Sequence, residues 1–175
     1  MKRPGAVSAG ECPMLKKVRI AIKTTQRELA TSLFHQKQGG EVSSEPSTIE
    51  LMMEGRYHDD GTRVTISYKE GELTGMKDAR TSISFQKSEP HLVTMTRDGA
   101  ARTAMIFEAG RRHLCIYQTP YMPFELAVAT KKVQNRIEEN GTLHLVYTAE
   151  IKGANGQYTD FTMTLLPDLG KPLGT

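Results

Sequence analysis

The sequence predicts an all-β protein, folded as an antiparallel up-and-down β-barrel of about eight to ten strands. Three observations indicate this fold. Apolar and polar residues alternate with period two in about ten short runs, turn-forming dipeptides separate these runs, and the links between them are short. Short links favour antiparallel pairing, because parallel strands need long crossover connections. A sheet of this many strands curls, and closure removes its exposed edges.

The predicted strands follow one another along almost the whole chain. Two further strands flank Asp98-Gly99, and another run ends at Tyr117. The dipeptides Asp60-Gly61, Asp98-Gly99, Asn140-Gly141 and Asn155-Gly156 tolerate positive φ in tight hairpins. The remaining alternating runs lie at residues 18–22, 49–53, 64–68, 82–85, 124–129, 143–152 and 161–165.

Residues 25–38 break the alternation. Thr25 and Glu28 have the spacing of a capping box, and Leu29 begins an apolar i, i+4 repeat. The pattern admits two interpretations. One is a short amphipathic helix in the first connection, which could cover the barrel mouth. The other is a mobile insertion over residues 27–47.

The chain of 175 residues suits one domain, since domains contain roughly 150 residues. We expect a flexible leader at 1–15, a single barrel domain at 16–166 and a flexible tail at 167–175. Lys2 and Arg3 are typical of a signal-peptide start, but no apolar segment follows them. No apolar run approaches the roughly 18 residues of a membrane span. The sequence therefore predicts a cytoplasmic protein with no membrane partner.

Composition and motifs exclude several classes of function. The net charge is +3, from 23 Lys+Arg and 20 Asp+Glu, so nucleic acid is not an expected partner. The chain has two cysteines, no C-x-x-C, no G-x-S-x-G, no H-E-x-x-H and no P-loop, so we expect no cofactor. His113 alone among five histidines shares a predicted strand face with Cys115 and Tyr117. His113 could be a metal or haem ligand, but a surface histidine beside Arg111 and Arg112 is the more ordinary interpretation.

Arg97 and Arg102 flank the Asp98-Gly99 turn. A two-residue hairpin would pair Arg97 with Ala100, and Arg102 would then share its face. Two guanidinium groups at the end of an apolar face would bind an anion in the barrel mouth. A bulged turn would shift the register by one residue and separate them.

Two connections carry further candidate ligand-binding groups. Glu72 and Thr74 lie in a link between strands, where they could reach the barrel rim. Tyr117, Thr119 and Tyr121 surround a proline turn and could form the opposite rim, because tyrosine combines an apolar body with a polar tip. Ordinary turn chemistry is the alternative interpretation of both segments.

Several of these segments resemble the YwiB-like family, a bacterial domain of unknown function. The resemblance rests on residues 68–76 (YKEGELTGM), residues 97–117 (RDGAARTAMIFEAGRRHLCIY) and the T-P-Y turn at 119–121. It spans about residues 16–166. It implies a calycin-like or lipocalin-like β-barrel in a cytoplasmic bacterial setting, and it supplies no activity and no catalytic residues. Met122 stands where the family commonly has Gly.

The first functional hypothesis is a barrel that binds a small anionic or amphipathic molecule without catalysis. Its candidate contacts are Glu72, Thr74, Arg97, Arg102, His113, Tyr117, Thr119 and Tyr121. The first alternative is a packed barrel that serves as an interaction module, for example as a homodimer. An enzyme that uses Glu72, His113 and Tyr117, and a weak nucleic-acid binder, are less favoured alternatives.

Overall fold

The computed structural model describes residues 14–29, 45–71, 78–151 and 156–167. These residues form one antiparallel sheet and one helical turn. The elements are β1 (Met14–Leu29), β2 (Ser47–Asp59), β3 (Arg63–Lys69), β4 (Arg80–Gln86), β5 (Val93–Asp98), β6 (Thr103–Phe107), β7 (Arg112–Gln118), β8 (Pro123–Arg136), α1 (Ile137–Asn140), β9 (Thr142–Ile151) and β10 (Gly156–Leu166).

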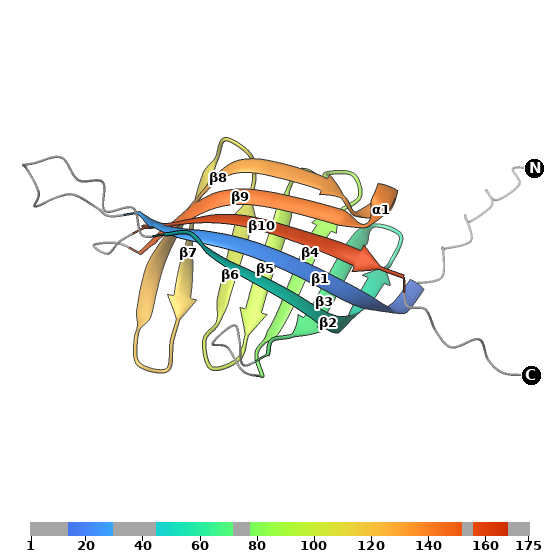
Figure 1. Cartoon of the computed structure of the whole chain (residues 1–175), viewed down its shortest axis with the longest axis horizontal. Helices are drawn as coiled ribbons and strands as arrows, with labels where there is room; N and C mark the ends of the chain where they lie inside the picture. Colours follow the sequence, from blue (N-terminus) through green and yellow to red (C-terminus); the bar gives the residue numbers. More distant parts are fainter. Residues whose placement is uncertain (1–13, 30–44, 72–77, 152–155, 168–175) are drawn as a thin grey trace, which may run out of the picture.

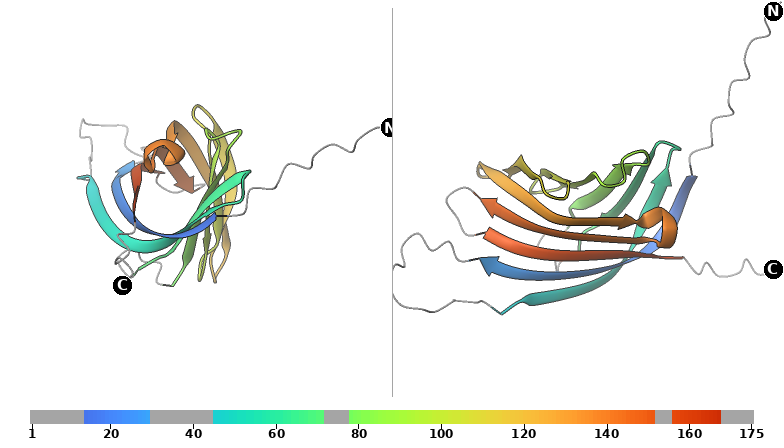
Figure 2. Two further views of the ribbon diagram at one scale, coloured as in Figure 1. Left: turned by 90° about the vertical axis from the view of Figure 1, so that its right-hand side faces the viewer. Right: turned by 90° about the horizontal axis from the view of Figure 1, so that it is seen from above.

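The ten strands follow the order β6-β5-β4-β3-β2-β1-β10-β9-β8-β7, and each neighbouring pair is antiparallel. The sheet curls until its two ends meet (Figures 1 and 2). Arg102 and Gln118 join β6 to β7 there through an isolated bridge with two backbone hydrogen bonds of 2.8 Å. The predicted up-and-down barrel is confirmed: it is nearly closed, and it is consistent with a calycin-like barrel.

The inner face of the sheet forms one hydrophobic core. Alternate residues of each strand point inward, as the period-two pattern predicts. At the end that holds α1, the buried side chain of Ile137 belongs to this core. Its fully buried side chains are Ile20, Val64, Ile66, Ile83, Val93, Met95, Phe107, Val128, Leu143, Leu145 and Met163.

The prediction of a helix that begins at Thr25 is wrong, because β1 continues to Leu29. Thr25 pairs with Thr48 of β2 on one side and with Asp160 of β10 on the other. Pairing on both sides satisfies the backbone groups that a helix would otherwise satisfy, so tertiary context overrides the capping-box spacing. Residues 30–38 of the predicted helix lie outside the described residues.

The boundaries of the domain differ slightly from the expected ones. β1 begins at Met14, inside the predicted leader, and Met14 and Leu15 pair with Asp59 and His58. β10 ends at Leu166. Within the described part of the chain, no helix has the length and hydrophobicity that a membrane span requires.

Candidate functional site

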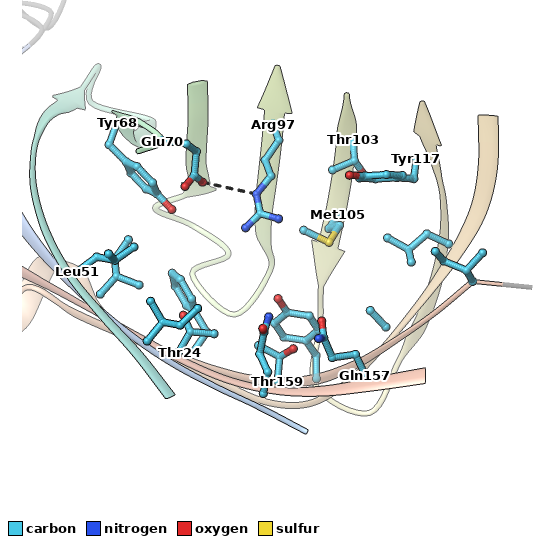
Figure 3. A pocket seen from close by; sticks show the side chains of 18 residues that line it. Thr24, Leu51, Tyr68, Glu70, Arg97, Thr103, Met105, Tyr117, Gln157 and Thr159 are labelled. Carbon is cyan, nitrogen blue, oxygen red and sulfur yellow. Dashed lines mark ion pairs between the residues drawn. The ribbon is translucent and has the colours of Figure 1, made fainter. Parts of the chain in front are cut away.

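The barrel interior opens into a cavity at the end opposite α1. The cavity has a volume of about 260 Å³, and Figure 3 shows it from close by. Its wall combines three kinds of side chain. Apolar groups come from Ile22, Ile49, Leu51, Met105, Leu126, Ile151 and Phe161, uncharged polar groups come from Thr24, Gln26, Thr103, Gln157, Thr159, Tyr68, Tyr117 and Tyr147, and the charged residues are Glu70 and Arg97.

The cavity arises because the inner face changes polarity along individual strands. On β1, the inward positions 20 and 22 are isoleucines, whereas Thr24 and Gln26 occupy the next two. On β10, inward Met163 and Phe161 give way to Thr159 and Gln157 toward the same end. Short polar side chains fill less space than the core residues and keep hydrogen-bonding groups at the cavity wall.

Glu70 and Arg97 form an ion pair at the cavity wall. The Glu70 side chain is 3% exposed, and its Oε1 lies 3.7 Å from Nε of Arg97. The same oxygen accepts a 2.6 Å hydrogen bond from the hydroxyl of Thr81. The backbone N–H of Glu70 donates to the carbonyl of Ala79 at 2.7 Å, which fixes the residue just beyond β3.

The Arg97 guanidinium is only partly satisfied. Its Nε is buried and has no hydrogen-bond partner among the described residues, since 3.7 Å exceeds hydrogen-bond distance. Figure 3 shows the guanidinium projecting from β5 toward the centre of the cavity, past Glu70. Glu70 therefore balances the charge of Arg97 without accepting a hydrogen bond from its Nε, and the two terminal nitrogens of the guanidinium point into the cavity (Figure 3).

Two buried tyrosines adjoin this pair. Burial raises the pKa of Tyr68, and Glu70 raises it further, whereas Arg97 acts in the opposite direction. Burial also raises the pKa of Tyr147, whose ring packs against Phe107 with centroids 4.7 Å apart. Both phenols are therefore neutral at neutral pH, so they act as hydrogen-bonding groups and not as bases.

Of the predicted site residues, the structure places Arg97 and Tyr117 in the cavity wall. Arg102 is excluded from it. Its side chain is 70% exposed, and its Nε lies 2.9 Å from Oδ1 of Asp98. The predicted pair of inward arginines is wrong because Arg97 pairs with Thr103 and not with Ala100. This odd change of register reverses the faces of β6.

The other predicted site residues that the structure describes lie away from the cavity. His113 is half-buried on β7, with its Nε2 3.3 Å from Oε2 of Glu108. Tyr121 is 95% exposed. Thr119 stabilises its own turn, because its hydroxyl donates to the carbonyl of Met122 at 2.8 Å and accepts from the Met122 N–H at 3.1 Å. A role for these residues in ligand binding remains a prediction.

Glu72 and Thr74 lie outside the described residues. In the described part of the chain, no three His, Cys, Asp or Glu residues cluster closely enough to bind a metal ion.

The sequence analysis missed Glu70, although the sequence contains a signal for it. Val64, Ile66 and Tyr68 alternate on the inner face, and Glu70 occupies the next inward position. An acid at the end of a core-facing series predicts a buried carboxylate that needs a partner. Its partner, Arg97, lies two strands away, and pairing across strands requires the register that the sequence alone does not supply.

The sequence pattern of a family described as "Domain of unknown function (DUF1934)" matches residues 31–165. The chain belongs to this family. The matched region includes Glu70, Arg97 and the strands β3 and β5. The resemblance to the YwiB-like family is thereby confirmed.

A solved structure also resembles this DUF1934 chain. It is described as the crystal structure of ywiB protein from Bacillus subtilis, with 18% sequence identity and a TM-score of 0.59. The similarity covers 86% of this chain and 94% of the other. At this identity the likeness concerns the fold alone. No curated protein matches the chain.

Proposed function

We propose that the barrel binds a small amphipathic anion, such as a carboxylate with an apolar body, in the cavity between β1 and β7. One observation carries this proposal: the Arg97 guanidinium projects into the cavity with a buried Nε that lacks a hydrogen-bond partner among the described residues. A carboxylate can accept two parallel hydrogen bonds from a guanidinium, which fixes its position and orientation.

The shape and polarity of the cavity support a small ligand. A volume of about 260 Å³ lies just below the roughly 300–1,000 Å³ of typical ligand pockets. The apolar side chains of Ile22, Leu51 and Met105 would contact the body of the ligand. The hydroxyls of Thr24 and Thr159 would contact polar substituents.

The proposal is for binding without catalysis in a cytoplasmic protein. The ionisable groups next to Arg97 are a buried carboxylate and two phenols whose pKa values are raised. Neither of these two phenols, Tyr68 and Tyr147, supplies a base near neutral pH. Retention of a ligand therefore uses the chemistry of these residues better than a proton-transfer step does.

Native mass spectrometry of the chain after gentle purification from cells tests the proposal without assuming a ligand. We expect an adduct of discrete mass that is lost on denaturation. Reproducible preparations that contain only the unliganded mass would contradict retention of a ligand.

A matched pair of probes tests the role of Arg97. We expect octanoate to bind at least about tenfold more tightly than 1-octanol, because only octanoate carries the carboxylate. The double variant Glu70→Gln/Arg97→Gln removes both charges and should abolish this preference. Arg102→Gln, on the same hairpin but outside the cavity, is the control and should retain it. Equal affinities of octanoate and octanol for the unmodified chain would sink the assignment.

A second candidate function is self-association, favoured by exposed apolar side chains near the β6–β7 seam. Leu114 and Ile116 are 62% and 57% exposed on β7, and Ile106 is 37% exposed on β6. Their side chains point outward on the two strands that the Arg102–Gln118 bridge joins. Light scattering across a range of protein concentrations should show a dimer that Ile116→Lys dissociates. A monomeric mass at every concentration would exclude this function.

A further inference from the structure

A groove crosses the outer face of the barrel from β1 to β4. It has a volume of about 410 Å³. The charged side chains of this groove lie on the outer face of the sheet, because they occupy the positions that alternate with the inward ones of β1 to β4. The ionisable side chains that line the groove are Lys17, Arg19, Arg56, Lys69, Arg80 and Glu54.

The groove holds two pairs of like charges in directly opposed positions. The β1–β2 register places Lys17 opposite Arg56, and the β3–β4 register places Lys69 opposite Arg80. Like charges that are directly opposite destabilise a sheet. An anion bound between the members of each pair would remove this repulsion.

The acidic groups nearby compensate the positive charge only in part. Lys69 lies 3.2 Å from Asp78, and both side chains are largely exposed. Glu54 lies opposite Arg19 in the β1–β2 register. Asp98 of β5 lies opposite Arg80, but no ion pair joins Lys17, Arg56 or Arg80 to an acid among the described residues. The groove therefore retains a positive field that favours an anion.

The spacing of the two pairs indicates a ligand with more than one anionic group. Neighbouring strands lie about 4.8 Å apart, and the Lys69–Arg80 pair is displaced by two residues along the strands from the row of Lys17, Arg56 and Ser67, so the centres of the two pairs are separated by roughly 12 Å. Ser67 lies between them, opposite Arg56, and contributes a hydroxyl to the groove. A linear anion with two or more charged groups matches this separation better than one compact monoanion does.

We propose that this groove binds a linear anion with two or more phosphate groups, held through the phosphates alone. Tyr68 is the aromatic residue among those that line the groove, and its ring faces the inner cavity (Figure 3). The described lining thus offers no ring on which a nucleobase could stack, which favours a polyphosphate over single-stranded nucleic acid.

Calorimetric titration of the full chain with inorganic tripolyphosphate tests this site. The variant Arg56→Glu/Arg80→Glu should weaken binding at least about tenfold, because it replaces one member of each basic pair. The control Arg112→Glu/Lys131→Glu changes the net charge equally at exposed positions on β7 and β8. It should change affinity by no more than about threefold at 0.15 M salt, because screening is strong beyond about 8 Å.

Thermal unfolding separates lost binding from lost folding. The groove variant removes the repulsion within each basic pair, but Arg80→Glu also places a second carboxylate opposite Asp98 of β5, so the two effects offset and its Tm without ligand should stay close to that of the unmodified chain. The plot of log affinity against log salt should also become less steep. The double variant Glu70→Gln/Arg97→Gln should leave tripolyphosphate binding unchanged, which separates this site from the cavity.

Three results would overturn the proposal. One is no binding of tripolyphosphate by the unmodified chain. Another is an equal loss in the groove and control variants, which would indicate general attraction to a positive protein. The third is tighter binding of a thymidine tetranucleotide than of tripolyphosphate with the same sensitivity to the groove variant, which would make the site one for nucleic acid.

Discussion

The two ends of the barrel interior are built from the same strands but differ in what fills them. Near α1, inward side chains such as Ile66, Leu143 and Met163 are fully buried and leave the interior closed. Toward the opposite end, the same strands present Thr24, Thr159 and the Glu70–Arg97 pair around a cavity. One sheet thus supplies a packed half that stabilises the fold and an open half that holds unsatisfied polar groups.

The largest expected effect is on stability, and it distinguishes the two halves directly. Leu143→Ala, in the packed half, should lower the free energy of unfolding by about 2–5 kcal/mol, because it removes a fully buried side chain and leaves a void. Leu51→Ala, at the half-buried cavity wall, should cost less than about 1.5 kcal/mol. Urea titration measures both. Equal losses would show that the open half is as tightly packed as the other.

The ion pair in the open half gives the next largest effect. Arg97→Gln leaves the carboxylate of Glu70 buried without its partner, which should cost about 1–3 kcal/mol. This value is below that for a fully buried pair because Arg97 is 28% exposed. Glu70→Gln/Arg97→Gln should recover much of the loss, because it removes both charges. A double variant no more stable than the single one would contradict this account of the pair.

Alkaline pH should affect the open half before the packed half. Burial raises the pKa values of Tyr68 and Tyr147. In the unfolded chain both phenols ionise near pH 10, whereas in the folded chain they stay protonated to higher pH. The stability that these two protonated phenols contribute is therefore fully present below about pH 10 and is lost as the pH rises through their raised pKa values.

Substitution of one phenol tests this assignment. Tyr68→Phe removes the ionisable group and should reduce the fall in Tm between pH 9 and pH 11. Tyr121→Phe alters a 95% exposed phenol and is the matched control, with no expected change in that fall. An unchanged pH dependence in Tyr68→Phe would mean that other groups cause the alkaline loss of stability.

The packed half was easier to predict from sequence than the open half. Period-two alternation identifies inward residues such as Val64 and Ile66 within a single strand, so the barrel and its core follow from local pattern. The cavity depends on which residues of different strands meet. Arg97 lines the cavity and Arg102 does not, because the turn between them sets a register that exchanges the inward and outward positions of β6. Residues 25–29 show the same limit, since pairing on both sides overrides their helical pattern.

The smallest expected effect concerns the outside of the packed half. Lys87 Nζ lies 2.6 Å from Asp59 and 3.5 Å from Glu138, so it links the β2–β3 turn to α1. The hydrogen bond from Lys87 holds the pKa of Asp59 below its usual range. The stability from this contact is present above the unfolded pKa of about 3.9 and is lost as pH falls through the folded value.

Lys87→Met should lower Tm at pH 7 by at most about 3 °C, because partly exposed pairs contribute little. The difference should shrink as the pH falls through the lowered pKa of Asp59, because the carboxylate then loses the charge that Lys87 contacts. A difference that persists unchanged in acid would assign the effect to packing of the Lys87 stem and not to its charge.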